Sequence, residues 1–325
     1  MVYRKKGRLH MVYLYRALTR RGLMTTKLLS LAEAIDRFVS DQAHVVMGTA
    51  LESCIPFAAG HELIRQGKNA LTLLGPISDI LFDQLIGAGC VRKVQAAWMG
   101  NVITGSGYNI RRAVESGQVV VEDHSNLTIT LALQAAALGV PFLPTRTALG
   151  SDLLQTNPTL HPFRCPITQQ QLLAVEALVP DVAIVHVQRC DAKGTAHLWG
   201  SLGLTKQACL ASKHVILTAE EIVAPEVIRS DPNRVLLPAF KVSAVCHVPW
   251  GAHPAPVPGY YNRDHQAFLD YQQASRTVAA FAAWLQHTVT GVTDRQAYCH
   301  ALGVDRLDAL RLTRHALAAP VDYGY

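Results

Sequence analysis

The sequence lacks the residue spacings that mark several common classes of functional site. Its seven cysteines are scattered and never arranged as C-x-x-C, so we expect reduced, mostly buried thiols rather than a metal site or a disulfide framework. No Walker A loop is present. His61 and Glu62 start a zincin-like motif, but Arg65 stands where the second histidine is required. Residues 105–110 carry two of the three dinucleotide-binding glycines, with Ile110 in place of the third. We therefore expect no metal and no nicotinamide cofactor.

The chain also lacks an uninterrupted apolar run of membrane-spanning length. Its longest uncharged stretch is NLTITLALQAAALGVPFLPT at residues 126–145. Threonines, a glutamine and a Gly-Val-Pro turn interrupt it, so it falls short of a membrane span. The pattern instead predicts a buried helix followed by a short strand, and we expect no membrane partner.

Acidic residues are absent from the first 23 positions, which carry seven Lys or Arg residues. Without this segment the chain has 23 basic and 24 acidic residues, so its body is nearly neutral and predicts no nucleic-acid partner. The segment has neither the apolar core nor the cleavage site of a secretory signal. We interpret residues 1–23 as a basic, disordered extension, explained either by an upstream start codon before Met24 or by an Arg-rich transit peptide. The expected location is the cytoplasm.

Short β-rich runs alternate with helical patterns along most of the chain. The first helix follows a capping box formed by Ser30 and Glu33. The runs that predict strands are HVVMG, ALTLLG, RKVQAAW, QVVVED, VAIVHV, HVILTA and KVSAVCHV. Further helices are expected at 57–66, 80–88, 110–116, 202–212 and 220–229, the last with Thr218 and Glu221 as a capping box. From Asp264 onward the pattern is helical.

The strand-like runs indicate the fold class. VAIVHV and HVVMG lack polar alternation, as expected for strands that are buried on both faces of a parallel sheet. Alternation of such strands with helices predicts an α/β protein with three α/β/α layers, a mostly parallel sheet and right-handed crossovers. No linker divides the chain, so we expect one domain over residues 24–325 with a helical C-terminal part.

The segments that follow the strands are expected to gather at one edge of this sheet. In open α/β sheets, ligands bind beyond the carboxyl ends of the strands. The segments concerned are GTALESCIP, GPISD, MGNVITGSG, EDHSN and PWGAHPAPVPGYY, at residues 48–56, 75–79, 99–107, 122–126 and 249–261. Together they predict a ligand site.

Four segments resemble the A subunit, or α chain, of the family I CoA-transferases of the glutaconate CoA-transferase type. They are DQLIGAGCVRKV, AAALGVPFLP, DVAIVHVQRCDAKGTAHLWG and GAHPAPVPGYYNRDHQAFLDYQQASRT. The similarity runs in register from about Met24 to about Leu312, which makes it far more specific than any single motif. It implies the three-layer fold of the superfamily that also contains sugar-phosphate isomerases.

The resemblance also implies an activity, which is transfer of coenzyme A from a thioester to a carboxylate. In this family a glutamate attacks the thioester and then carries CoA as its own thioester, a form of covalent catalysis. That glutamate resides in the family's B subunit, and nothing in this chain is similar to its motif. The resemblance therefore implies a B-subunit partner in an A2B2 or larger assembly. It further implies a CoA thioester as co-substrate, a carboxylic acid as acceptor and no covalently bound cofactor.

The family's glycine-rich loops are only partly matched. Gly48 matches the first glycine of the first-strand loop, whereas Thr49 replaces the second. Gly75 matches the start of a second loop that here reads Gly-Pro-Ile-Ser-Asp. Glu52 and Ser53 lie in the first loop and are either contacts of the acyl substrate or solvent-exposed polar residues before the next helix. These departures leave the identity of the substrate open.

Two further polar positions have alternative interpretations. Ser78 is a candidate for binding a substrate carboxylate together with Asp79, but we expect both residues to cap the helix that starts there. Asn101, after the third strand, either faces the site or forms a turn. Gly48, Thr49, Glu52, Ser53, Gly75, Ser78, Asn101 and His253 are the candidate substrate-binding residues.

Glu122 is the candidate catalytic residue within this chain. Some relatives of the family hydrolyse carbon–carbon bonds in steroid-derived CoA esters with an A-chain glutamate, and Glu122 is our candidate for that role. The alternative is that Glu122 and Asp123 lead into a helix N-terminus, where negative charge is favourable. His253 lies in the proline-rich loop, which holds Trp250 and Tyr260 and is expected to wall the site near the B subunit.

Two other functions are weighed against CoA transfer. The first is a paired-subunit hydrolase or lyase that acts on a cyclic, steroid-derived CoA ester. The second is a non-catalytic effector-binding module of the same fold, as in some bacterial repressors. That module would need a DNA-binding domain, and the basic extension of about 23 residues is too short for a helix-turn-helix.

Overall fold

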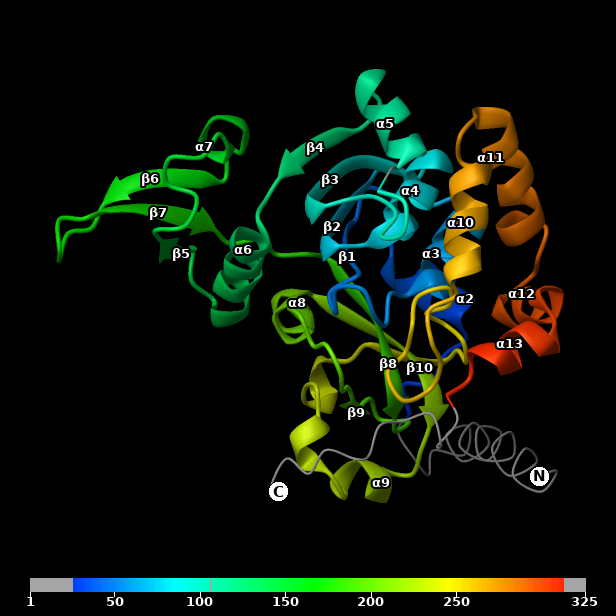
Figure 1. Cartoon of the computed structure of the whole chain (residues 1–325). Helices are drawn as coiled ribbons and strands as arrows, with labels where there is room; N and C mark the ends of the chain where they lie inside the picture. Colours follow the sequence, from blue (N-terminus) through cyan, green and yellow to red (C-terminus); the bar gives the residue numbers. More distant parts are fainter. Residues whose placement is uncertain (1–25, 106, 313–325) are drawn as a thin grey trace.

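The computed structural model describes residues 26–105 and 107–312, so the predicted basic extension 1–23 lies outside the described part. Most strands form one central sheet, shown in Figure 1. They are β1 (His44–Val46), β2 (Leu71–Ile77), β3 (Val91–Trp98), β4 (Val120–Asp123), β8 (Val182–Cys190), β9 (Ala196–His197), β10 (His214–Ile222) and β11 (Ala244–His247). The order across the sheet is β11-β10-β8-β1-β2-β3-β4, and β9 pairs with β8. All neighbours are parallel except β8 and β9, which confirms the predicted sheet.

Helices cover both faces of the central sheet. One face is covered by α2 (Leu31–Phe38), α3 (Phe57–Arg65), α4 (Asp79–Gly87) and α5 (Tyr108–Glu115), and the other by α6 (Asn126–Leu138) and α8 (Thr205–Ala211). Successive strand residues point into different cores: Val45 joins the cluster under α2 to α4, and Val46 joins the cluster under α6 and α8. This double burial explains why the strands read as unbroken apolar runs, and the three-layer prediction is confirmed.

The C-terminal helices line one side of the molecule, as predicted (Figure 1). They are α10 (His265–Ala274), α11 (Val278–Leu285), the π-helical η3 (Gln286–Thr290), α12 (Arg295–Leu302) and α13 (Val304–Leu310). Phe268 and Tyr271 of α10 enter the core beneath α3 and α4, so this part of the chain belongs to the same hydrophobic body. The capping box of Ser30 and Glu33 is also present at the start of α2.

A small second sheet extends away from the main body on the left of Figure 1. Its antiparallel order is β5-β7-β6, from β5 (Phe142–Thr145), β6 (Leu160–Arg164) and β7 (Gln171–Glu176), with α7 (Leu153–Thr156) beside it. The sequence predicted only the first of these strands. The core of this sheet is formed by few residues, chiefly Leu160, Leu173 and Val175 beside Ala132 of α6.

The predicted helix over residues 220–229 is wrong. β10 continues to Ile222, which pairs with Cys190 of β8, and the predicted capping residues Thr218 and Glu221 therefore lie inside a strand. Only a short helix, α9 (Pro225–Arg229), follows, before the single 3-10 turns η1 (Pro232–Arg234) and η2 (Ala239–Lys241).

The second glycine loop also begins later than predicted. Gly75 lies within β2 and pairs with Ala96 of β3, so the loop after β2 starts only at Ser78. In the described ranges, none of the helices has both the length and the apolar character that a membrane crossing requires.

Candidate functional site

The strand order reverses beside β1. The chain moves outward from β1 through β2 and β3 to β4, and later places β8 on the other side of β1. Ligands of open α/β sheets bind at such a switch point, beyond the carboxyl ends of the strands. We call this edge the carboxyl rim and define it as residues 47–56, 78–79, 99–105, 199–204 and 249–263.

Close backbone contacts join the ends of β1 and β2. Gly48 has a φ of 66°, and a Cβ there would lie 2.4 Å from Ser78 Oγ and 2.8 Å from the carbonyl oxygen of Ile77. A Cβ on Gly75 would lie 2.4 Å from the carbonyl oxygen of Met47, to which Ser78 Oγ donates a hydrogen bond of 3.3 Å. The structure thus brings Gly48, Gly75 and Ser78 together. Ser78 occupies the predicted N-cap position of α4, but its side chain makes no cap bond to the helix.

Thr49 joins the first loop to an exposed turn that the sequence did not single out. Its hydroxyl lies 3.0 Å from the Thr205 hydroxyl, and its carbonyl oxygen accepts from the N–H of Leu204 at 2.9 Å. A Cβ on Gly203 would lie 2.1 Å from that same oxygen. The turn 200–203 therefore belongs to the rim, and the glycines at both of its ends were the available sequence signal.

Strained backbone is concentrated at the rim. Eight non-glycine residues of the described chain have positive φ, and four of them lie here: Leu51 at 62°, Cys54 at 53°, Asp79 at 51° and Trp250 at 61°. The left-handed region is unfavourable for such side chains, and strain of this kind gathers at functional sites.

Glu52 and Ser53 differ in exposure. The Glu52 carboxylate is about half exposed and forms an ion pair of 2.8 Å with Arg263. Ser53 is buried, and its hydroxyl donates to the carbonyl oxygen of Ala50 at 3.3 Å. Glu52 is therefore the accessible member of this pair.

Asp79 is a fully buried acid at the start of α4. Its Oδ1 accepts from the backbone N–H groups of Ile80 at 3.0 Å and Val102 at 3.2 Å, whereas its Oδ2 has no partner among the described residues. Burial raises the pKa of Asp79 to about 7, although these two hydrogen bonds and the Arg263 charge oppose the shift. The carboxyl group is therefore partly protonated at neutral pH.

Asn101 stabilises the loop after β3 from within. Its side chain is fully buried and donates to the carbonyl oxygen of Phe268 at 2.9 Å. Its Oδ1 accepts from the N–H groups of Ile103 and Thr104 at 2.9 and 3.3 Å. These contacts correspond to the turn-forming interpretation.

Glu122 lies on β4, separated from β1 by β2 and β3. Its carboxylate accepts from Lys93 Nζ at 2.6 Å and Gln95 Nε2 at 2.5 Å, and lies 3.1 Å from His124 Nε2. Burial alone would raise its pKa, but the hydrogen bonds from His124, Lys93 and Gln95 outweigh it and lower the pKa of Glu122 to about 2. Glu122 is therefore ionised at neutral pH and is a weak base.

His253, within the proline-rich loop, is fully buried. Its Nδ1 lies 2.9 Å from the Tyr298 hydroxyl and its Nε2 lies 3.0 Å from Asp264 Oδ2. Burial lowers the pKa of His253 to about 4; Asp264 opposes this shift and the Arg295 charge adds to it. A neutral, fully bonded histidine stabilises the loop, and it has no surface on which to touch a ligand.

Glu220 is a buried anchor for the same loop that the sequence did not reveal. Its carboxylate accepts from the Tyr261 hydroxyl at 2.7 Å, from His186 Nε2 at 2.8 Å and from the N–H of Trp250 at 2.8 Å. Burial opposes ionisation, yet the bonds from His186, Trp250 and Tyr261 lower its pKa. Glu220 therefore fixes the proline-rich loop to β8 and β10.

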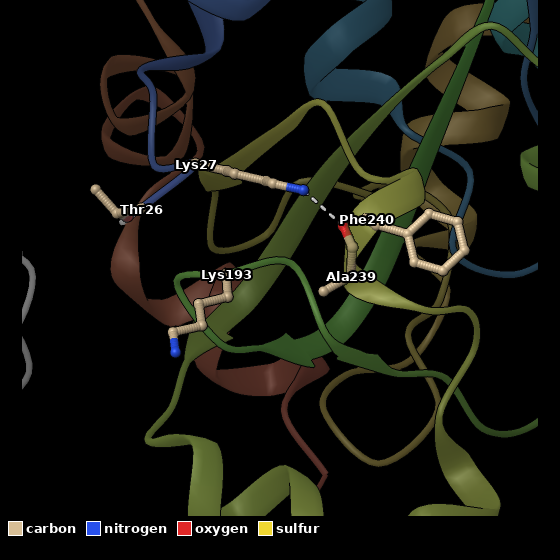
Figure 2. A pocket seen from close by; sticks show the side chains of 5 residues that line it. All are labelled: Thr26, Lys27, Lys193, Ala239 and Phe240. Atoms are coloured by element: carbon tan, nitrogen blue, oxygen red, sulfur yellow. Dashed lines mark hydrogen bonds between the residues drawn. The ribbon is translucent and has the colours of Figure 1, made fainter. Parts of the chain in front are cut away.

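A separate cavity of about 350 Å³ lies outside the rim and is shown in Figure 2. Its lining residues are Thr26, Lys27, Lys193, Ala239 and Phe240. Lys27 Nζ is already directed at backbone oxygens, including that of Ala239 at 2.6 Å, so Lys193 is the other cation among the described lining residues. No candidate substrate-binding residue lines it. No cluster of three metal-ligating side chains occurs within residues 26–105 and 107–312.

Known proteins resemble the chain over most of its length. The family model described as coenzyme A transferase matches residues 28–247. The A subunit of 3-oxoadipate CoA-transferase from Pseudomonas knackmussii is 41% identical over 271 residues, which cover 82% of this chain and 95% of that protein. The A subunit of glutaconate CoA-transferase from Acidaminococcus fermentans is 32% identical over 307 residues, or 88% and 95% of the two chains.

Similarity in structure follows the similarity in sequence. The crystal structure of glutaconate CoA-transferase from Acidaminococcus fermentans superposes with a TM-score of 0.85 at 31% identity, over 89% of this chain and 97% of that one. One subunit of the cholesterol ring-cleaving hydrolase of Mycobacterium tuberculosis is 30% identical over 201 residues, which are 59% of this chain and 69% of that protein. The two transferase chains are thus matched more completely than the hydrolase chain.

Proposed function

The chain belongs to the coenzyme A transferase family and is an A subunit of a two-chain enzyme, and we propose that it transfers CoA between dicarboxylic acids. The acids named for its transferase relatives, 3-oxoadipate and glutaconate, both carry two carboxylates. The partner is a B subunit, the assembly is A2B2 or larger, and the location is the cytoplasm. Residues from 24 onward act as one A-subunit domain.

The carboxyl groups of the rim indicate which of the two chains supplies the nucleophile. The rim contains only two of them, Glu52 and Asp79. Glu52 is paired with Arg263, and Asp79 is fully buried with a raised pKa. A nucleophilic carboxylate must be ionised and accessible to the thioester. Asp79 is not fully ionised, and Glu52, although accessible, is held in its ion pair with Arg263, which supports a nucleophile from the B subunit.

The reaction proceeds through successive acyl substitutions, each at a single carbonyl carbon. The carboxylate of the B-subunit glutamate attacks the thioester carbonyl, expels CoA thiolate and forms a mixed anhydride. The thiolate then attacks the glutamyl carbonyl, which releases the first carboxylic acid and leaves a glutamyl-CoA thioester. The acceptor carboxylate repeats these two steps in reverse order and leaves as the new CoA ester.

The part assigned to this chain is to bind substrate and to stabilise oxyanions. Each addition step places negative charge on an oxygen, and backbone N–H groups of turns after strands stabilise such charge. The loops that begin at Met47 and Ser78 are held together by the close approach of Gly48 and Gly75. They would supply these donors beside the acyl group.

Hydrolysis of a cyclic CoA ester is the less supported alternative. It would require Glu122 to act as a base, and three hydrogen-bonded partners lower the pKa of Glu122 to about 2. A general base works best with a pKa near the working pH. The effector-binding alternative has no match among the similar proteins described above.

The test is to isolate the chain from its native cells together with its partner and to add mixed acyl-CoA esters. Intact-mass analysis should then show the partner, and not this chain, gaining the mass of CoA. An adduct on this chain, or hydrolysis of the ester without any adduct, would contradict the proposal. If no partner co-purifies, the two-chain assignment fails.

A further inference from the structure

Three buried polar atoms of the carboxyl rim have no hydrogen-bond partner among the described residues: Thr104 Oγ1, Arg263 Nε and Asp79 Oδ2. The last two belong to ionisable side chains, Arg263 Nε as a donor and Asp79 Oδ2 as an acceptor that becomes a donor when protonated. Buried polar groups in folded proteins are almost always hydrogen-bonded. Arg263 and Asp79 also interact electrostatically with each other, so a single ligand can complete both of their unpartnered atoms.

Arg263 is held rigidly by its neighbours in the chain. Tyr261 is fixed by its bond of 2.7 Å to Glu220, and Asp264 is fixed by Arg306 at 2.7 Å. The guanidinium lies over the Phe268 ring at 5.7 Å. Its position is therefore set before any ligand binds, which reduces the entropy cost of binding.

The guanidinium retains binding capacity on one side. Its Nη2 donates to Glu52 Oε2 at 2.8 Å, while Nε is left without an acceptor in the described part of the chain. Glu52 is about half exposed and Arg263 is mostly buried. The planar guanidinium suits a second carboxylate, because its N–H groups match carboxylate geometry.

Asp79 is oriented so that its unpartnered oxygen is fixed. Two backbone N–H groups hold Oδ1, so Oδ2 is the atom left to carry a proton. The charge of Arg263 favours the ionised form of Asp79 and the charge of Glu52 opposes it, with burial dominant in raising its pKa to about 7. The three side chains thus interact with one another across the ends of β1, β2 and the proline-rich loop.

We infer that Arg263 and Asp79 form the subsite for the non-reacting carboxylate of the substrate, an inference that rests on the proposed function. The Nε–H of Arg263 donates to one carboxylate oxygen, and the protonated Oδ2 of Asp79 donates to the other. A monocarboxylic acid has no second carboxylate for this subsite. Arg263 and Asp79 are therefore specificity-determining residues.

A structural ion pair between Glu52 and Arg263 is the competing explanation. Removal of either partner would then have the same effect, because either change breaks the same pair. A substrate subsite predicts opposite effects, since Arg263→Gln removes the donor whereas Glu52→Gln frees it. The two variants are thus matched controls for each other.

The experiment uses the co-purified two-chain enzyme with succinate, glutarate and adipate as acceptors, each beside the monocarboxylic acid of equal chain length. Arg263→Gln should raise the KM of the best dicarboxylic acid by about 10- to 100-fold, the effect of losing a hydrogen bond to a charged group. It should leave the KM of the monocarboxylic acid unchanged. Glu52→Gln should lower the KM of the dicarboxylic acid, because it releases the Arg263 guanidinium from its ion pair. Equal increases in both variants, or for both kinds of acid, would overturn the inference.

Asp79→Asn provides a second, independent test. Two backbone donors require the amide oxygen at the Oδ1 position, so the NH₂ group takes the place of Oδ2 and remains a donor. Asp79→Ala removes the donor and should raise the KM of the dicarboxylic acid, whereas Asp79→Asn should raise it less. Equal KM values for the wild type and Asp79→Ala would remove Asp79 from the subsite. Melting temperatures and co-purification of the partner verify folding, and a wild-type enzyme that transfers CoA to none of these acids would refute the proposed function instead.

Discussion

At the scale of single residues, Asp79 combines several features that destabilise the folded state. The side chain is fully buried, its backbone is left-handed, and one of its oxygens is unpartnered among the described residues. Each feature is unfavourable in the folded state. A stable fold retains such a residue only when its surroundings impose it, and here the first turn of α4 and the loop after β3 both hold Oδ1.

Asp79→Asn should stabilise the isolated chain in a pH-dependent manner. Burial raises the pKa of Asp79 from 3.8 to about 7, so the wild type loses stability as the pH rises from about 4 through 7. Asparagine has no charge to bury and avoids this loss. The variant should match the wild type near pH 4 and exceed it at pH 8 by on the order of 4 kcal/mol. Denaturant unfolding across this range measures the difference, and a constant difference at every pH would contradict the prediction.

Gly48 must be glycine for two reasons. Its φ is positive, and a Cβ at this position would have no room. Gly48 and Gly67 have nearly equal φ values of 66° and 63°, but a Cβ on Gly67 would meet nothing within 4 Å. Gly67→Ala should therefore cost only about 1–2 kcal/mol for the left-handed backbone. Gly48→Ala should cost about 1–3 kcal/mol more, because its Cβ overlaps Ser78 and a carbonyl oxygen.

The measurement for this pair is the free energy of unfolding together with CoA transfer by the two-chain enzyme. Gly67→Ala should retain transfer, since it lies in the turn after α3. Gly48→Ala should lose it, since the loops after β1 and β2 are pushed apart. If Gly48→Ala and Gly67→Ala lost the same free energy of unfolding, the contact between these loops would contribute nothing to stability.

At the scale of elements, the local sequence pattern was sufficient to predict those strands and helices that local interactions determine. The strands β1, β2, β3, β8 and β11 and the helix α3 were predicted within a few residues. Their apolar runs and caps are encoded in consecutive positions. The strand β10 was predicted too short because Glu220 looks like a helix residue until its distant partners are known. The antiparallel strands β6 and β7 were not predicted, since only a small core supports them.

The site was predictable in location and largely unpredictable in detail. The loops after parallel strands share one edge by geometry, so Gly48, Gly75 and Ser78 could be placed near one another. Arg263 could not, because it reaches Glu52 across 211 positions of the chain. The buried bonds of Asn101 likewise depend on α10, which lies 167 positions away. Partners that come from so far along the chain leave no local signal.

At the scale of the whole molecule, the two cores share one sheet. The cluster beneath α2 to α4 and the cluster beneath α6 and α8 meet through alternate residues of the same strands. The rim lies at the end of this shared sheet, so loops from both sides of β1 have fixed positions relative to each other.

The partner chain, the B subunit, should stabilise this chain according to mass action. A partner that binds only the folded state adds stability as its free concentration exceeds the dissociation constant, by about 2.7 kcal/mol at a hundredfold excess. The melting temperature of this chain should therefore rise as the partner is added and reach a plateau only at large excess. Calorimetric scans at increasing partner concentration measure this shift, with heat-denatured partner as the control. A melting temperature that does not depend on the partner would mean that the rim is complete within one chain, and the nucleophile would then have to be found among its own carboxylates.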